Sequence, residues 1–227
     1  MTFADHVLSF LRHLDLEAPL PPGVAVMNPF RDPKTYGLCR RFYRKYYHDH
    51  RPRHLVIGIN PGRFGGGITG IPFTDPIRLQ EACGIRNGFV KKQELSSVFV
   101  YEMIRAFGGT ERFYQSFYIS SVSPLGFTRQ QKNLNYYDDR ALQECLRDFV
   151  TGCLEKQLSF GLSREVAYCL GEGKNHAYLE KLNREHRFFE KITPLPHPRF
   201  IMQYRLKQKE AYIREYLVRL QAAGQKP

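Results

Sequence analysis

With 227 residues, of which 42% are hydrophobic, the chain can bury one sizeable core, and we expect a single domain over residues 1–227. Its 34 Lys and Arg residues outnumber its 22 Asp and Glu residues, and the resulting net charge of +12 favours a polyanionic partner, although a ribosome or a membrane surface would attract it equally well. No run of 18 apolar residues occurs, which excludes a membrane-spanning helix.

Residues 1–50 are predicted to form a helical extension packed on the rest of the domain. Apolar residues at helical spacing in residues 2–16 predict an amphipathic helix that Thr2 can cap. Several prolines then predict an irregular stretch up to residue 33. Residues 36–47 predict a second helix with a basic, aromatic-rich face.

Further along the chain, short apolar segments alternate with helical patterns. Strands are predicted at residues 53–59, 117–119, 166–170 and 188–192. Helices are predicted at residues 93–107, 138–158, 174–186 and 204–222. Such alternation is typical of a parallel sheet covered on both faces. The fold is therefore predicted to be α/β, a three-layer α/β/α sandwich with a central four-stranded, mainly parallel sheet.

A glycine-rich loop follows the first predicted strand, in residues 58–73. It begins Gly-Ile-Asn-Pro-Gly and ends Thr-Gly-Ile-Pro-Phe, and its glycines allow the backbone to approach a ligand closely. A mobile surface loop is the alternative, although the regular pattern argues against it. The other three strands also end in unusual loops, at residues 120–127, 171–175 and 195–204. Because parallel strands place their carboxyl ends along one edge, we expect the four loops to form one ligand site.

Two separated motifs resemble those of the uracil-DNA glycosylase superfamily. The segment from Gly58 to Gly62, with 69–73, resembles the first motif, and His197-Pro198 resembles the second. Between them, residues 122–125 look like the strand end that carries the uracil-reading residue. The resemblance spans about residues 53–205 and is closest to the single-strand-selective monofunctional (SMUG) branch. The 171–175 loop departs from the best-known animal members and indicates a divergent bacterial subgroup.

This resemblance implies the uracil-DNA glycosylase fold and an enzyme that hydrolyses the N-glycosidic bond of uracil in DNA. Asn60 would position the attacking water, and His197, as a neutral imidazole, would donate toward the uracil O2. Phe73 would stack on the base that has left the helix. The structural alternatives are an Asx turn at Asn60, a histidine that caps local backbone, and an ordinary core phenylalanine.

The pocket wall would come from the first motif, with Gly62 and Arg63 beside backbone contacts at Ile59 and Phe64. One position departs from the family. Where SMUG proteins use an asparagine to read the uracil edge, this chain has Ser121, whose hydroxyl cannot form the paired contact of an amide. Backbone groups, a bridging water or Asn175 could then read the base, and 5-substituted uracils or other deaminated bases become candidate substrates.

DNA contacts are predicted after the second motif. A wedge that fills the gap left by the flipped base is expected from Arg199, Phe200, Ile201, Met202 and Gln203. Phosphate contacts are expected from Arg205, Lys207, Lys209, Arg214, Lys91, Lys92 and Arg129. The alternatives are a helix start docked on the core and a solvated basic face.

Neither catalytic position is a lysine, so we expect no Schiff base and no strand cleavage. No metal or organic cofactor is expected. The five cysteines include no CxxC pair and are interpreted as core residues in a reducing compartment. With no signal-peptide pattern at the start, we expect a cytoplasmic protein, used at the nucleoid and monomeric. The rival functions are a non-catalytic damaged-DNA-binding protein and, with less support, a nucleotide-phosphate-binding enzyme.

Overall fold

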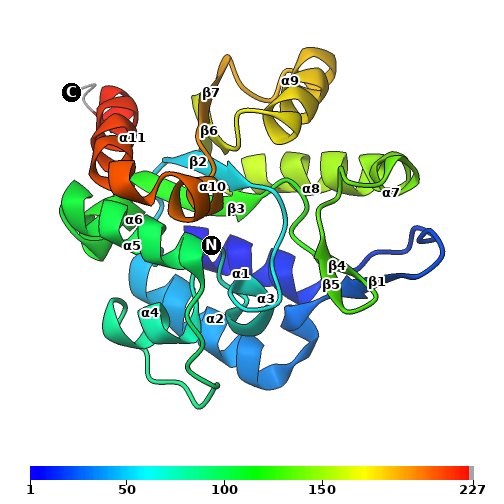
Figure 1. Ribbon diagram of the computed structural model, residues 1–227, viewed down its shortest axis with the longest axis horizontal. Coiled ribbons are helices and arrows are strands. Elements are labelled where there is room, and N and C mark those ends of the chain that lie inside the picture. The colour runs from blue at the N-terminus through cyan, green and yellow to red at the C-terminus, as the bar shows by residue number, and fades with distance from the viewer. Residues whose placement is uncertain (225–227) are drawn as a thin grey trace.

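The computed structural model describes residues 1–224, and its centre is a four-stranded sheet (Figure 1). The strands are β2 (Arg53–Gly58), β3 (Phe117–Ser121), β6 (Leu162–Leu170) and β7 (Lys191–Leu195), in the order β3-β2-β6-β7. Each of the three neighbouring pairs is parallel. The predicted α/β fold with a four-stranded parallel sheet is therefore confirmed.

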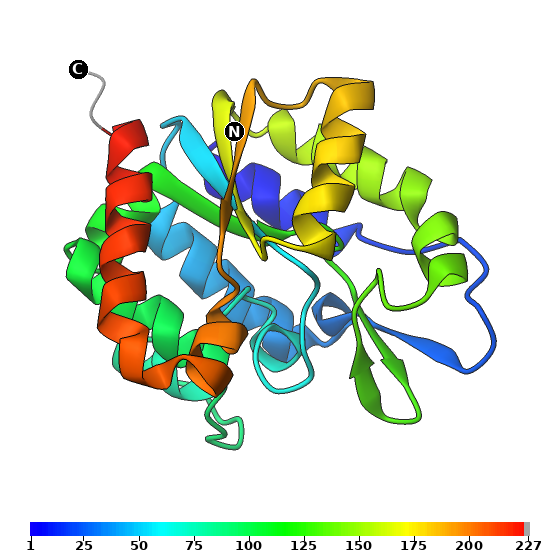
Figure 2. The same ribbon diagram turned by 45° about the horizontal axis from the view of Figure 1, so that its top comes forward.

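Helices cover both faces of this sheet (Figures 1 and 2). One face carries α5 (Leu95–Phe107), α6 (Thr110–Ser116) and α11 (Lys209–Gly224), which pack on one another. The other carries α8 (Arg147–Leu158) and α9 (Lys174–His186), which both contact β6. The predicted three layers are confirmed, and the four strand ends are left open along one edge.

Residues 1–50 form α1 (Phe3–Arg12) and α2 (Pro33–Tyr46), as predicted. Thr2 and Asp5 form a capping box at the start of α1. The stretch between the two helices is less irregular than predicted, since it contains the strand β1 (Val24–Met27) and the 3₁₀ turn η1 (Pro29–Arg31). The four residues of β1 are too few and too exposed to show an alternating pattern.

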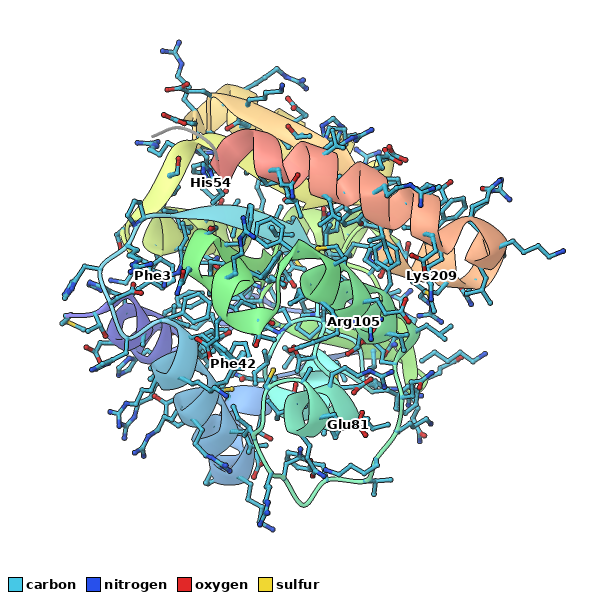
Figure 3. All side chains as sticks on the ribbon, turned by 90° about the vertical axis from the view of Figure 1, so that its left-hand side faces the viewer. Phe3, Phe42, His54, Glu81, Arg105 and Lys209 are labelled. Atoms are coloured by element: carbon cyan, nitrogen blue, oxygen red, sulfur yellow. The ribbon has the colours of Figure 1, made fainter. Side chains whose placement is uncertain are left out.

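A buried arginine joins this amino-terminal region to the start of β2. Arg53 has no exposed surface, and its guanidinium lies 4.8 and 4.7 Å from the ring centres of Phe3 and Tyr47. It pairs with Asp49 at 2.8 Å and donates from Nε to the backbone oxygen of Tyr114 at 2.8 Å. Figure 3 shows Phe3 among the packed side chains of this region. The buried charge is thus fully hydrogen-bonded, as burial requires.

A second sheet, which the sequence analysis did not predict, stands beside the carboxyl edge of the first. Its strands are β1, β4 (Gly126–Arg129) and β5 (Lys132–Leu134), joined antiparallel in the order β1-β4-β5. Strands this short carry little periodicity, and their pairing joins segments about a hundred residues apart in the chain. The β4–β5 hairpin projects from the molecule in Figure 2.

The predicted long helix at 138–158 is two helices, α7 (Arg140–Cys145) and α8, which meet at Leu146. Leu146 is fully buried, and its ψ of -5° lies away from the ideal helical value of about -42°, which marks the break between the two helices. The last strand lies three residues later than predicted. After α9 ends at His186, Asn183 binds both the backbone N–H and the C=O of Phe189, so residue 189 is not available to a strand. The strand then includes Pro194, which is tolerated because β7 is at the edge of the sheet.

Four short helices were missed: α3 (Gly66–Thr69), α4 (Pro76–Glu81), α6 and α10 (Pro198–Tyr204). With α10 and the turn η2 (Leu206–Gln208) in place, α11 starts at Lys209 instead of residue 204. Lys209, labelled in Figure 3, pairs there with Glu102 of α5 at 2.5 Å by its ammonium group. All five cysteines are free. Four of them are buried, which confirms their interpretation as core residues, whereas Cys145 is half-buried. Among residues 1–224, no helix has both the length and the apolar character needed to cross a membrane.

Candidate active site

A cavity of about 630 Å³ opens at the carboxyl edge of the four-stranded sheet. Its lining includes residues that follow each strand: Asn60 after β2, Ser121 at the end of β3, Gly171 after β6 and His197 after β7. The predicted convergence of the four loops is confirmed. Other lining residues were not predicted: Glu94, Ser96, Asn133, Asn135, Tyr137.

The glycine-rich loop is folded back on itself. The Gly67 N–H donates to the Gly62 carbonyl at 2.9 Å, and a side chain at residue 67 would lie 2.6 Å from that oxygen. Thr69, which is fully buried, donates to the Thr74 carbonyl at 2.6 Å and closes the loop after α3. The loop is therefore folded by its own contacts into a wall of the cavity.

Asn60 is held by backbone from a distant segment. Its Nδ2 donates to the Leu134 carbonyl at 3.2 Å, and its Oδ1 accepts from the Tyr136 N–H at 3.0 Å. An Asx turn would instead require Oδ1 to accept from the backbone just after Asn60, so that alternative is not what forms. Nδ2 also lies 3.5 Å from the Pro61 carbonyl, the longest contact of this amide, and one lone pair of Oδ1 remains for a water.

His197 is the N-cap residue of α10, and its Nδ1 accepts from the Arg199 N–H at 3.1 Å. An accepting Nδ1 carries no hydrogen, so the neutral ring has its hydrogen on Nε2. Burial, assisted by the nearby Arg199 charge, lowers the pKa of His197 to about 4. The ring is therefore a neutral donor at physiological pH. Local capping and a role in the cavity are compatible here, because different ring nitrogens serve them.

Phe73 ends the glycine-rich loop with φ at +53°, a left-handed conformation that costs a non-glycine residue about 1 kcal/mol or more. Its ring lies on the backbone of Gly58, where a Cβ would come within 2.6 Å of it. The ring centre is 6.0 Å from that of His197. Gly58 thus makes room for an aromatic surface next to the imidazole.

Two comparisons identify the family. A family model described as the uracil DNA glycosylase superfamily matches residues 44–221. The chain belongs to this superfamily. The crystal structure of wild-type SMUG2 from Pedobacter heparinus is similar to it, with a TM-score of 0.97, 48% sequence identity and 100% of each chain covered. A comparison with curated proteins found no match. The predicted SMUG-like branch and its fold are thus confirmed, and the protein is a DNA glycosylase with DNA as its partner.

Ser121, the position at which this glycosylase departs from its family, lies at the cavity. The residue is nearly buried and lines the cavity, and its hydroxyl has no hydrogen-bond partner among residues 1–224, which leaves it to a ligand. Asn175 also lines the cavity, but both of its amide hydrogens are engaged. Its Nδ2 donates to the Leu170 carbonyl and toward Cys169 Sγ, at 3.1 and 3.3 Å, and its Oδ1 accepts from Tyr136. With no amide hydrogen left to donate, Asn175 cannot form the paired contact with a base edge, and its prediction as a reader of the base is wrong.

Glu94 brings a carboxyl group into the cavity. It is the N-cap residue of α5, yet its side chain does not cap the helix and instead lies against Gly65, where a Cβ would overlap the carboxylate. Burial and the fully buried carboxyl of Asp75 raise the pKa of Glu94 to about 7, against the opposing effects of a hydrogen bond with Ser96 and of the Arg199 charge. In the sequence, Glu94 is visible only as an acidic residue at the start of a predicted helix, and nothing there indicates that its side chain faces a cavity.

The predicted wedge and pocket wall are only partly at the cavity. Arg199, Phe200 and Gln203 line it, as do Ile59 and Gly62. Ile201 is fully buried in the core, so its prediction as a DNA contact is wrong, since the inward face of α10 docks on α5. Met202 is partly buried against the same core. Arg63 and Phe64 lie outside the lining, with the Arg63 guanidinium 5.0 Å from the Phe64 ring centre.

The predicted phosphate contacts differ in how free they are. Lys207 on η2 and Arg214 on α11 are exposed. Arg205, which follows α10, is also exposed but donates to the Tyr204 carbonyl at 3.2 Å and lies 5.5 Å from the Phe200 ring centre. Three more have protein partners: Lys91 donates to Asn87, Lys92 lies 3.6 Å from the Phe64 ring centre, and Arg129 pairs with Asp139 at 2.6 Å. Lys209 is engaged by Glu102. Across residues 1–224, no three His, Cys, Asp or Glu side chains cluster as a metal site would need.

Proposed function

We propose that the protein is a monofunctional uracil-DNA glycosylase of base-excision repair. The observation that carries the proposal is a neutral His197 with its hydrogen on Nε2, in the same cavity as a backbone-held Asn60. Uracil leaves deoxyribose as an anion whose charge gathers on O2, so a neutral donor at that oxygen stabilises the transition state. A histidine with an ordinary pKa would be partly cationic near neutral pH, whereas the low pKa of His197 keeps its ring neutral there.

The attacking water is a weak nucleophile in this reaction, because Asn60 cannot accept its proton. The C1′–N1 bond therefore breaks largely before attack, with the bonding electrons going to uracil. Water then adds to the oxocarbenium-like C1′ and releases its proton to solvent. Asn60 contributes by orienting that water, which lowers the entropic part of the barrier.

The substrate base has to leave the DNA stack to reach this cavity. The Phe73 ring offers a stacking surface worth about 1–3 kcal/mol, next to His197. Phe200, 42% exposed at the cavity, and the neighbouring Arg199 are the candidates to fill the gap in the DNA. Ser121 would read the base edge through its hydroxyl, together with backbone groups or a water. The protein would act as a monomer.

The product would be free uracil and an intact strand with an abasic site, since no lysine stands at the catalytic positions to form a Schiff base. No cofactor enters this scheme. The related SMUG2 of Pedobacter heparinus supports the SMUG-like assignment through its fold and identity. Substrates with 5-substituted uracil or other deaminated bases are included in the proposal.

Single-turnover excision from a uracil oligonucleotide, followed by alkali to reveal abasic sites, tests the function. Asn60→Ala and His197→Asn should lower the rate by about 10²–10³-fold while DNA affinity stays within a few fold. His197→Asn is the sharper variant, because asparagine can keep the cap of α10 while removing the Nε2 donor. DNA binding with no excision by the wild type would instead identify a damaged-DNA-binding protein, and loss of affinity in the variants would contradict the assigned roles.

A further inference from the structure

The amide of Asn60 is fixed by residues 134–136, a segment that joins β5 to α7. Its upstream end is secured in the second sheet, where Leu134 pairs with Phe127 of β4. Its downstream end is Tyr136, whose N–H is the donor to Asn60 Oδ1 at 3.0 Å. The orientation of Asn60 therefore depends on where the Tyr136 backbone lies.

The Tyr136 side chain ties that backbone to the main sheet. Its hydroxyl donates to Asn175 Oδ1 at 2.8 Å, and both groups are almost without exposed surface. Asn175 in turn donates to the Leu170 carbonyl at the end of β6. A continuous series of hydrogen bonds thus runs from β6 through one phenol to the amide that faces the cavity.

We propose that Tyr136 is a positioning residue for Asn60, holding its amide in the orientation that the attacking water needs. This inference rests on the proposed function, in which Asn60 orients water. An asparagine amide rotates broadly about its last side-chain bond, so two backbone contacts on one rigid segment are needed to define it. Without the phenol hydroxyl, Asn175 Oδ1 is a buried acceptor with no donor, and the ring and its backbone have reason to move.

The series also explains why the second sheet borders the cavity. It anchors one end of the 134–136 segment, while the phenol anchors the other. One anchor is in the second sheet and the other is Asn175 of α9, which is bonded to Leu170 of β6, so the Asn60 orientation depends on how the second sheet packs against α9 and β6.

The test compares two phenylalanine substitutions in the full-length protein. Tyr136→Phe removes the bridging hydroxyl. Tyr178→Phe is the matched control, because the Tyr178 ring packs 5.1 Å from that of Tyr136 and its buried hydroxyl has no partner among residues 1–224. We expect Tyr136→Phe to slow single-turnover uracil excision by about tenfold with unchanged DNA affinity, since small displacements of positioning groups have effects of this order. Tyr178→Phe should excise at the wild-type rate.

A readout specific to Asn60 separates positioning from general loosening. In the Asn60→Ala background, Tyr136→Phe should cause no further loss of rate, because the group it positions is gone. A wild-type rate in Tyr136→Phe, or an equal loss in both backgrounds, would overturn the inference. Should Tyr136→Phe not fold, Asn175→Ala breaks the same bond and carries the same expectation. A wild-type rate in Asn60→Ala alone would instead refute the role that the proposed function gives Asn60.

Discussion

Replacing Gly58 by alanine should disable the stacking surface from behind. Gly58 is the last residue of β2, and its added Cβ would lie 2.6 and 2.8 Å from Cε2 and Cζ of Phe73. Its next neighbour, the Ser120 carbonyl, would be at an ordinary 3.6 Å. The strand can therefore accept the methyl group while the Phe73 ring cannot.

The size of the effect follows from these distances. Carbon atoms pack at about 3.5–4.0 Å, so the ring has to move by about 1 Å. The displacement costs stability of about 1–3 kcal/mol, as overpacking of a close-packed site does. If the ring no longer meets the base face, the lost stacking is about 1–3 kcal/mol. At about 1.4 kcal/mol per tenfold, kcat/KM for uracil excision should fall about 5- to 150-fold.

The assay is excision of uracil from an oligonucleotide at substrate concentrations well below KM, with thermal unfolding measured in parallel. Gly37→Ala in α2 is the control, because a Cβ there meets nothing within 4 Å, and it should leave the rate unchanged. In a Phe73→Ala background the Gly58 substitution should have little further effect. A wild-type rate in Gly58→Ala would refute the reasoning that the ring position supports catalysis.

Four further predictions concern charge and selectivity. Because the pKa of Glu94 is about 7, its carboxyl is neutral below that pH and charged above it, where its charge opposes the developing uracil anion. The excision rate should therefore fall as pH rises through about 7. Glu94→Gln should remove this step from the pH–rate profile. With its pKa at about 4, His197 should stay neutral on the acid side, so a loss of rate between about pH 5 and 6 would contradict its assignment. DNA affinity should fall with salt, and Lys207→Ala should reduce the log–log slope by about 1, measured by fluorescence anisotropy, whereas an unaltered slope would dismiss this contact. Ser121→Asn should sharpen the preference for uracil over other bases in an oligonucleotide panel, and unchanged selectivity would remove Ser121 as the reader.

Local signals account for the predictions that succeeded. The helix at residues 174–186 was predicted with its observed bounds, and the order of the four central strands and of the long helices between them followed from apolar patterning. Two of the missed helices also carried local signals, since Asp75-Pro76 and His197-Pro198 are an N-cap followed by proline at the first helical position. Pro198 was interpreted only as part of the His-Pro motif, so the helix that begins at this proline was not predicted.

The sequence by itself determined the α/β class, the meeting of four loops at one sheet edge, and the pair of residues, Asn60 and His197, on which the proposed chemistry rests. The class and the meeting of the loops depend on residue order and on spacings of a few residues, whereas the pair of residues came from two motifs that resemble those of the superfamily. Only the tertiary structure decided that Asn175 is occupied by other groups, that Ile201 faces inward and that Glu94 shares the cavity. Such facts depend on which distant segments pack together, and in a close-packed interior that is set by the whole chain at once.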